Sequence, residues 1–477
     1  MVVAPTPSAR RVLLVVAFGY LLASWAMNPV SSILPTITTD LDIDVQKAGW
    51  IMNGYFVLLV GGVLIAGRLG DAFGHGKLFR AGCLVFAVGA FIAVLPLDFA
   101  VLVAARAVQG LGSAMIFGTS LALVATAFPG PRLAWAVGIL TVFAGLASLI
   151  GTWASTSLIQ FTSWHTTFLI PCVLGLGITA AAGNLPSEGR TNVADIDWLG
   201  GALLFGGLIF LLLGLNHLHE GPETFEAGAP YHLTMHAIAL SFLVLFLWRQ
   251  LRAPKPLVRL KLLRIPRLST GVVANGIAHS SMLATSLIIP FLIERGEGYT
   301  PVQTQQLLLV QQVSLIVCSL LGGWLYSRTG TPAIGILSIG AIATGLAVLG
   351  RVGAELPYTG LFPVVAVLGA GLGVFTAVNN TAVMSTVSAD QRGFASGLVE
   401  TTRQLGHSVG VSISSGVLQT SLAAAALPEL GYREGFSEAA SAMGLVSAIG
   451  VLVVLYPVLK SRVSPLTVPG LRYRPTE

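Results

Sequence analysis

The chain has 477 residues, of which 54% are hydrophobic and only 10% are charged, and its mean hydropathy is +0.83. Soluble domains contain about 25% charged residues, so this composition excludes an ordinary soluble protein and predicts an integral membrane protein. The net charge of +6 does not indicate a nucleic-acid partner, because in a membrane protein the placement of charge matters more than its sum.

Apolar stretches long enough to cross a bilayer recur along the chain, since a spanning helix needs about 20 mostly apolar residues. We count fourteen of them. The expected spans are 12–34, 48–67, 78–96, 99–127, 134–158, 166–184, 197–215, 233–251, 269–293, 302–325, 332–350, 358–384, 394–420 and 439–459.

The placement of charge predicts the orientation. If both termini are cytoplasmic, twenty of the 26 Lys and Arg residues lie in cytoplasmic segments and four lie outside, and Arg106 and Arg403 fall inside spans. Cytoplasmic loops carry an excess of Lys and Arg. The densest basic segment, 249–267, lies on the inner side, where it can meet anionic lipid head groups. We therefore expect a multi-pass protein of the cell membrane.

Two short segments form an internal repeat. Residues 67–74 read GRLGDAFG and residues 323–330 read GWLYSRTG, and each follows the second of six spans. The repeat predicts two six-span halves, 1–186 and 268–477, which are separated by two extra spans and a basic linker at 187–267.

With these features the sequence resembles the major facilitator superfamily, and within it the fourteen-span drug:proton antiporter branch. The resemblance implies an all-α membrane protein with two six-helix bundles related by a pseudo-two-fold axis, plus two extra central transmembrane helices. The family's loop motif between the second and third spans is matched here at Gly67, Leu69, Asp71, Gly74 and Lys77. The resemblance implies that this loop governs the conformational switch.

The second copy of the motif carries Gly323, Arg328 and Gly330, which we assign to the same gate. Glycines at these positions let two helices and a tight turn approach closely, and Asp71 is expected to face a helix N-terminus or an arginine of the opposite half. The alternative is a positively charged turn that only fixes the topology.

Arg106 begins the segment RAVQGLGSA in the fourth span, close to the family's Arg-x-x-Gln-Gly motif. An arginine in mid-helix costs about 2.5 to 3.5 kcal/mol to insert, so it should face a cavity or a partner. The resemblance implies that Arg106 takes part in proton coupling. The alternative is a structural arginine bonded to backbone carbonyls.

The thirteenth span contains VETTRQLGHSVG, which places Glu400, Arg403, Gln404 and His407 on one helical stripe. An ion pair between Glu400 and Arg403, one turn apart, would lower the cost of burying either. Burial raises the pKa of an acid and a nearby cation lowers it. We therefore predict that Glu400 carries the proton, with Arg403 and His407 in the same group. A permanent pair that only joins two helices is the alternative.

Other polar residues within the spans predict a wet central cavity. Each alone is more often an interhelical hydrogen-bonding residue than a ligand contact. A few polar groups on an apolar wall suit bulky, partly lipophilic substrates. The predicted cavity residues are Asn53, Tyr55, Gln109, Asn275, His279, Gln305, Gln312 and Asn379.

Two family motifs are altered. The acid that the family carries in the first span is replaced by Ala26, and the Gly-Pro-x-x-Gly-Gly motif of the fifth span appears as GTWAST from Gly151. An outer loop holds His217, His219 and Glu220, with His232 and His236 following. We interpret these histidines as surface residues and expect no metal site and no cofactor.

The sequence therefore predicts a secondary active transporter that exports lipophilic or amphipathic compounds by alternating access in exchange for protons, and that acts as a monomer. It contains no Gly-x-x-x-x-Gly-Lys-Ser/Thr nucleotide loop and no protease-type catalytic motif, so we expect no enzyme. The alternatives are a narrow-specificity exporter of one metabolite, siderophore or lipid, and a transporter-like sensor or scaffold.

Overall fold

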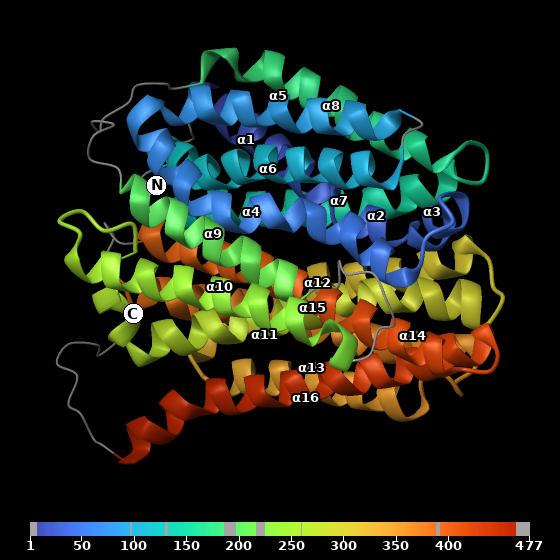
Figure 1. The fold of residues 1–477 in the computed structure, drawn as a ribbon. Coiled ribbons are helices and arrows are strands. Elements are labelled where there is room, and N and C mark those ends of the chain that lie inside the picture. Colours follow the sequence, from blue (N-terminus) through green and yellow to red (C-terminus); the bar gives the residue numbers. More distant parts are fainter. Residues whose placement is uncertain are drawn as a thin grey trace.

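A computed structural model describes residues 7–95, 98–128, 132–185, 197–215, 225–258, 260–387 and 392–463. All the regular elements in these ranges are helices, and most of the long ones run roughly along one common direction (Figure 1). The start of α1 and the end of α16 lie at the same end of the assembly.

The N-terminal half contains the helices from α1 to η2, the C-terminal half contains those from α11 to α16, and α9 and α10 lie between them in the chain. Their bounds are α1 Pro7–Trp25, α2 Asn28–Ser31, α3 Leu34–Asp40, α4 Val45–Phe73, α5 His75–Val94, α6 Phe99–Ala127, α7 Arg132–Leu158, η1 Trp164–Phe168, α8 Leu169–Ala181, η2 Ala182–Asn184, α9 Trp198–Leu215, α10 Phe225–Arg252, η4 Leu260–Arg264, α11 Pro266–Phe291, η5 Leu292–Gly296, α12 Pro301–Thr329, α13 Ala333–Val352, α14 Tyr358–Ser385, α15 Arg392–Ala424 and α16 Pro428–Val463.

Thirteen of the fourteen expected spans correspond to helical segments that are long and apolar enough to cross a membrane, within the described residues. The remaining one is α15, which has 33 residues and is long enough, but which falls short in hydropathy. Its polar residues include Glu400, Arg403 and His407. A helix this polar is suited to a membrane protein only if its polar face is buried within the bundle.

The first span departs from the expected single helix over 12–34. The helix α1 ends at Trp25, and the short helices α2 and α3 follow it, each with a proline in its first turn. Proline lacks a backbone N–H, so it cannot donate the hydrogen bond that would continue a preceding helix. Pro29 and Pro35 therefore break the span into three pieces.

The two halves pack in the same way, as an internal repeat requires. In the N-terminal half α4 packs on α6, α5 on α8 and α1 on α7, and in the C-terminal half α12 packs on α14, α13 on α16 and α11 on α15. The halves meet where α4 packs against α15 and α7 against α12. These pairs are equivalent in the two repeats, so the interface itself follows the pseudo-two-fold symmetry.

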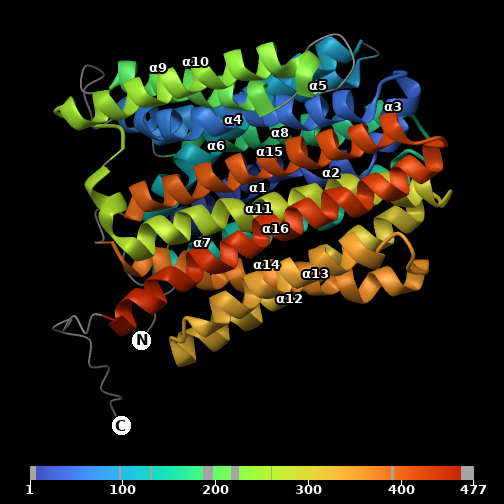
Figure 2. The same cartoon turned by 60° about the horizontal axis from the view of Figure 1, so that its bottom comes forward.

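The two extra helices lie at one edge of the assembly (Figure 2). They pack on each other, and α9 also packs closely against α4 and touches α15. Gly61 of α4 faces the ring of Phe205, and a Cβ atom there would lie 2.3 Å from the ring. The pair α9–α10 therefore covers the seam between α4 and α15 on one side.

The repeated loop motif ends a long helix in both halves. Gly74 closes α4 with a φ of 97°, and Gly330 closes α12 with a φ of 61°. Side chains other than glycine rarely adopt these angles. The close packing expected of Gly67 is present, because a Cβ there would lie 3.4 Å from the Gly118 carbonyl, whereas Gly323 has more room.

The two expected partners of Asp71 are a helix N-terminus and an arginine of the opposite half. Its carboxylate lies 3.1 Å from Nε2 of His75, the first residue of α5, and 3.9 Å from Nη1 of Arg68, so both contacts are within its own half. Lys77 is exposed in the first turn of α5, and Arg328 lies over the ring of Trp324 at 4.2 Å. Among the described side chains, Asp71 contacts the start of α5 and Arg68 rather than an arginine of the opposite half.

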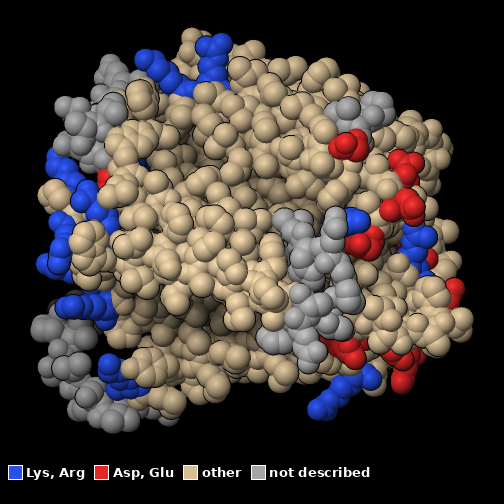
Figure 3. All heavy atoms as spheres, in the orientation of Figure 1, with Lys and Arg blue, Asp and Glu red and all other residues tan. Residues whose placement is uncertain are grey.

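Charge is divided between the two ends of the molecule. Figure 3 shows most Lys and Arg side chains at the end that holds both termini, and most Asp and Glu side chains at the other. Apolar side chains cover the surface between them. We call these the basic end and the acidic end.

The basic end of α9 is joined to α10 by a buried carboxylate. Asp197, whose side chain is 2% exposed, accepts hydrogen bonds from Nε of Arg249 at 2.9 Å and from Nε2 of Gln250 at 2.8 Å. Oε1 of Gln250 in turn accepts from the N–H of Val258 in the basic linker, and Arg68 donates to the carbonyl oxygen of Pro256. The linker is thereby fixed to both the extra helices and the gate loop.

The surroundings of the glycines predict very different effects on stability when a single glycine is replaced by alanine. At Gly110 a Cβ would lie 1.9 Å from the carbonyl oxygen of Tyr55, whereas at Gly340 nothing lies within 4 Å. Gly110→Ala should lower the thermal unfolding temperature in detergent by several degrees, because it pushes α6 from α4. Gly340→Ala should leave it unchanged or raise it, since alanine favours helix by about 1 kcal/mol. Equal effects would contradict the close packing.

A second prediction concerns Asp197. Burial by itself raises the pKa of this carboxyl, but the hydrogen bonds from Arg249, Gly200 and Gln250 outweigh it and hold the pKa below its ordinary value. Its contribution to stability is therefore complete above about pH 4 and is lost as pH falls through the lowered pKa. Asp197→Ala should cost about 1.5–3 kcal/mol at neutral pH.

Thermal unfolding of both proteins at a series of pH values measures this. The difference between wild type and Asp197→Ala should shrink only under strongly acidic conditions. Asp98→Ala, which removes an exposed cap of α6, serves as the control and should cost about 1 kcal/mol. A difference that disappears near neutral pH would contradict the lowered pKa.

Candidate functional site

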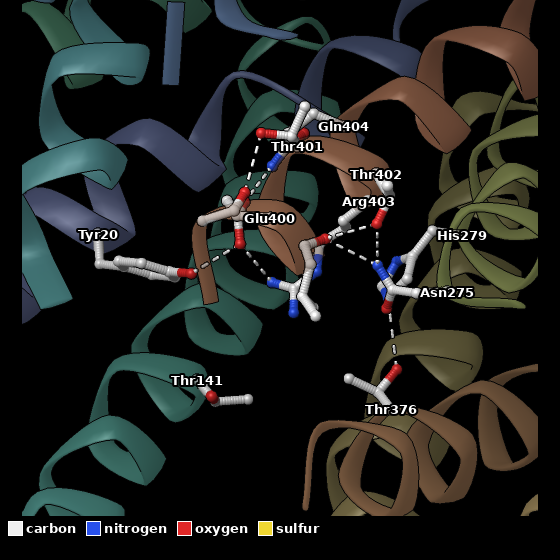
Figure 4. Close-up of polar contacts among 12 residues, drawn as sticks. Tyr20, Thr141, Asn275, His279, Thr376, Glu400, Thr401, Thr402, Arg403 and Gln404 are labelled. Carbon is white, nitrogen blue, oxygen red and sulfur yellow. Dashed lines mark hydrogen bonds and ion pairs between the residues drawn. The ribbon is translucent and has the colours of Figure 1, made fainter. Parts of the chain in front are cut away.

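A buried ion pair lies where the two halves meet. On α15, Nη1 of Arg403 lies 3.1 Å from Oε2 of Glu400, and the two side chains are 19% and 11% exposed. The hydroxyl of Tyr20 on α1 donates to the same Oε2 at 3.3 Å. Figure 4 shows Tyr20 reaching Glu400 from the opposite half. The carboxylate therefore links the halves directly.

The polar contacts continue from Glu400 into the C-terminal half. Nε2 of Gln404 donates to Oε1 of Glu400 at 2.6 Å, and Oε1 of Gln404 lies 3.2 Å from Nδ1 of His407. Nε2 of His407 lies 3.1 Å from Nδ1 of His279 on α11, whose Nε2 lies 3.4 Å from Oγ1 of Thr376 on α14. This chain of polar contacts thus runs across three helices, α15, α11 and α14.

Asn275 lies next to this chain of polar contacts and links α11 to α15 by hydrogen bonds. Its Nδ2 donates to the carbonyl oxygen of Val399 at 2.8 Å and to Oγ1 of Thr402 at 3.3 Å (Figure 4). Close glycine contacts support the same helix pair, since a Cβ at Gly406 would lie 2.1 Å from the carbonyl oxygen of Gly276. The close approach of α11 and α15 brings His279 within reach of His407.

Arg106 belongs to a separate cluster in the N-terminal half. Its Nε donates to the carbonyl oxygen of Ile51 at 3.0 Å, its Nη1 to Oε1 of Gln109 at 2.5 Å, and its Nη2 to the carbonyl oxygen of Ala26. The ring of Tyr55 lies 4.9 Å from the guanidinium carbon. A small cavity adjoins Arg106. These contacts match the alternative of an arginine bonded to backbone carbonyls, and a role in proton coupling stays a prediction.

The expected cavity residues separate into groups. Asn53 is fully buried in the seam, where its Nδ2 donates to Ser412 and its Oδ1 accepts from Ser408. Nε2 of Gln305 donates to the carbonyl oxygen of Trp153, across the other seam. Both residues join the halves in this conformation.

Of the other expected residues, Tyr55 donates to the carbonyl oxygen of Ala23 and, with Gln109, belongs to the Arg106 cluster. Nε2 of Gln312 and Nδ2 of Asn379 are buried and have no hydrogen-bond partner among the described residues. His217, His219 and Glu220 lie outside the described residues, and no group of three metal-ligating side chains occurs within them.

The sequence did not reveal two residues that contact the polar network around Glu400, namely Tyr20 and Thr376. The search of the first span looked for an acid and found Ala26, but the polar side chain that this span contributes is Tyr20, one and a half turns earlier. Thr376 also went unnoticed, because a single threonine in an apolar span gives no signal. The tyrosine hydroxyl in an otherwise apolar helix was the available clue.

The helical bundles and the paired interfaces define a polytopic membrane protein built from two repeated halves. A family model described as "Major Facilitator Superfamily" matches residues 16–411. The chain belongs to the Major Facilitator Superfamily. It is a transporter and not an enzyme.

Several characterised relatives carry resistance or export names. The chain is 30% identical to the tetracenomycin C resistance and export protein of Streptomyces glaucescens, covering 92% of this chain and 83% of that protein. It is 23% identical to the riboflavin transporter RibZ of Clostridioides difficile, with 86% and 88% covered. A crystal structure of a mutant of the nucleoside transporter NupG aligns with a TM-score of 0.62 at 13% identity, over 94% and 99% of the two chains, which supports the fold.

The Arg106 contacts generate a stability prediction. Arg106→Met keeps the length of the side chain but removes every donor, so the Ala26 carbonyl and Gln109 lose a buried partner. Each buried acceptor left without a donor costs about 1–3 kcal/mol. The free energy of unfolding in detergent should fall accordingly, and Arg351→Met, at an exposed arginine near the end of α13, should change it little. If Arg106→Met left the free energy of unfolding unchanged, the stabilising role of the Arg106 hydrogen bonds would be contradicted.

Proposed function

We propose that this protein is a secondary active exporter of lipophilic or amphipathic compounds that exchanges them for protons, of the fourteen-span drug:proton antiporter type. The observation that carries the proposal is the Glu400 carboxylate, which lies between the halves and contacts Tyr20 on one side and Arg403 on the other. The antibiotic resistance and export proteins among its relatives support export.

Glu400 is placed so that one proton changes the contact between the halves. When it is ionised, its Oε2 holds both the Tyr20 hydroxyl and the Arg403 guanidinium. Hydrogen bonds to an ionised acceptor are about twice as strong as neutral ones, and more so where water is scarce. Protonation of Glu400 weakens both contacts, so the bond between α1 and α15 loosens and the halves become free to rearrange.

The hydrogen bonds across the seams favour one access state. Asn53 with Ser408, Gln305 with Trp153, and Arg295 with the carbonyl oxygen of Pro35 all join the halves nearer to the acidic end. This end is therefore closed. We assign the conformation to the state that faces the basic end, in which Asn53 and Gln305 hold the opposite end shut.

The excess of Lys and Arg assigns the basic end to the cytoplasm. Both termini are then cytoplasmic, and the conformation is ready to take up substrate from inside the cell or from the inner leaflet. The gate loops that end at Gly74 and Gly330 lie at the same end. We propose a cell-membrane monomer whose ligands are protons and a small apolar or amphipathic substrate.

The substrate site proposed here lies in the C-terminal half. The buried amides of Gln312 and Asn379 each have a donor atom without a partner among the described residues, and His279 is within reach of Thr376. Loosely placed polar groups on an apolar wall fit compounds that bind mostly by area.

A second candidate is a narrow-specificity exporter. Two relatives are named for one compound each, tetracenomycin C and riboflavin. The altered GTWAST segment of α7 supports this candidate too, because it lacks the proline and the paired glycines that bend the helix in typical drug antiporters. The two candidates share the Glu400 site and differ in the breadth of the substrate panel that they transport.

The proposal is tested in proteoliposomes with an imposed pH gradient and a panel of lipophilic cations and neutral amphiphiles, puromycin and riboflavin among them. Glu400→Gln should reduce proton-driven transport by about tenfold or more, the effect of losing about 1.4 kcal/mol of coupling free energy. Downhill substrate exchange without a pH gradient should persist, because the variant keeps the size and polarity of the side chain.

Glu438→Gln is the matched control. Glu438 accepts a hydrogen bond from Ser421 near the acidic end and lies far along the chain from the ion pair, so its variant should transport like wild type. If Glu400→Gln keeps full proton-driven transport, the proton site is refuted. If wild type moves none of the panel, export of lipophilic compounds is refuted.

A further inference from the structure

The chain of contacts from Glu400 to Thr376 has a direction that its chemistry fixes. It consists of Glu400, Gln404, His407, His279 and Thr376, joined by four contacts of 2.6, 3.2, 3.1 and 3.4 Å. The first four residues are buried. The proposed function uses Glu400 at one end and the contact of His279 with Thr376 at the other, so the link between the two ends through Gln404 and His407 has no role yet.

The direction begins at the carboxylate. An ionised carboxylate only accepts, so the amide of Gln404 must turn its N–H toward Oε1 of Glu400. Its carbonyl oxygen then faces His407 and accepts from Nδ1, which must carry a hydrogen. A neutral imidazole has one N–H, so Nε2 of His407 is an acceptor.

The same reasoning continues to the end of the chain. Nε2 of His407 accepts, so Nδ1 of His279 donates to it and Nε2 of His279 is left as an acceptor. Thr376 fills that position by donating its hydroxyl. A doubly protonated His407 is disfavoured because Arg403 places a positive charge one turn away on the same helix in a buried site.

We propose that protonation of Glu400 reverses every hydrogen bond in this chain and turns Nε2 of His279 from an acceptor into a donor. The proposal rests on the proposed role of Glu400 in proton exchange. The proton settles on Oε1, because Oε2 already receives Tyr20 and Arg403. Protonated Oε1 donates to the Gln404 carbonyl, and the amide turns its N–H toward Nδ1 of His407.

The protons balance over the chain. One proton enters from water at Nε2 of His279, the Nδ1 proton of His279 passes to Nε2 of His407, and the Nδ1 proton of His407 reaches Glu400 by way of the Gln404 amide. Each imidazole ends with one proton, moved from Nδ1 to Nε2, and the net change is one proton on Glu400. No bond other than N–H and O–H bonds is made or broken.

The reversal selects a class of substrate. The contact between His279 and Thr376 is the longest in the chain at 3.4 Å, and Thr376 is only partly buried. A substrate hydroxyl, amine or amide N–H can replace the Thr376 hydroxyl while Glu400 is ionised. Once Glu400 is protonated, Nε2 of His279 carries a hydrogen and can no longer accept a hydrogen bond from the same substrate group. Binding of a hydrogen-bond donor and of a proton therefore exclude each other.

The charged and titratable groups around the chain are few. Tyr20 from α1 and Arg403 from α15 contact Glu400, and Arg403 is the cation nearest to His407 along α15. From α4 the phenol of Tyr55 interacts electrostatically with Glu400 and the ring of Phe56 packs against His407, and from α14 Thr376 contacts His279. Titration of the chain is therefore expected to follow Glu400 and not a remote group.

Imidazole tautomers can be measured without a substrate. We would replace the six histidines outside the pair with glutamine, label the remaining two with ¹⁵N, and record ¹⁵N spectra of the full-length protein in lipid bilayers from alkaline to acidic pH. The infrared carbonyl band of the protonated carboxyl, assigned with Glu400→Gln, reports Glu400 in the same samples. We expect both rings to change from Nδ1–H to Nε2–H at the midpoint pH of Glu400.

Gln404→Leu interrupts the chain and should leave the tautomers of both rings independent of Glu400, while Thr376→Val should leave the switch of His407 intact. If Glu400 titrates and the rings keep one tautomer or become doubly protonated, the reversal is refuted and the proton site of the proposed function stands. If Glu400 does not titrate in the accessible pH range, the proposed function itself is refuted, and the reversal is refuted with it.

Discussion

The buried carboxylate of Glu400 is the contact on which the polar interior of this protein depends. In a bilayer, polar groups away from water must find their partners within the protein. Glu400 meets this condition with Arg403 and Gln404 on its own helix and Tyr20 from the other half. Because these partners come from both halves, the cost of burying the charge is low only while the Tyr20 hydroxyl of α1 reaches Glu400 on α15.

Close helix packing brings these groups together. The equivalent pairs α4–α6 and α12–α14 each contain a glycine against a partner's backbone, at Gly110 and Gly369, where a Cβ would lie 1.9 Å and 2.1 Å from a carbonyl oxygen. Small residues let membrane helices approach in this way. The repeat therefore conserves backbone geometry between the halves, while the side chains on that frame differ, and the polar clusters differ with them.

The sequence predicted features that depend on residues near one another in the chain, but not contacts between residues far apart in it. Span positions followed from apolar length, and the two turns at Gly74 and Gly330 followed from spacing. The pair of Glu400 with Arg403 followed from helical periodicity, since one turn separates them. The bond from Tyr20 to Glu400 joins residues 380 positions apart, and no periodicity reports such a contact.

The break in the first span shows the same limit. Pro29 and Pro35 are visible in the sequence, but an apolar count treats 12–34 as one helix. Arg106, 80 positions away, donates to the Ala26 carbonyl next to the break.

The two polar clusters differ in what they can do. Arg106 binds backbone carbonyls and one amide, none of which changes charge, so its cluster supports a fixed geometry of α1, α4 and α6. The Glu400 cluster contains a carboxylate and two imidazoles, whose hydrogen bonds depend on where protons reside. In the proposed function, Tyr20 joins this N-terminal cluster to the titratable cluster of the C-terminal half, so that protonation of Glu400 changes how firmly the two halves are held.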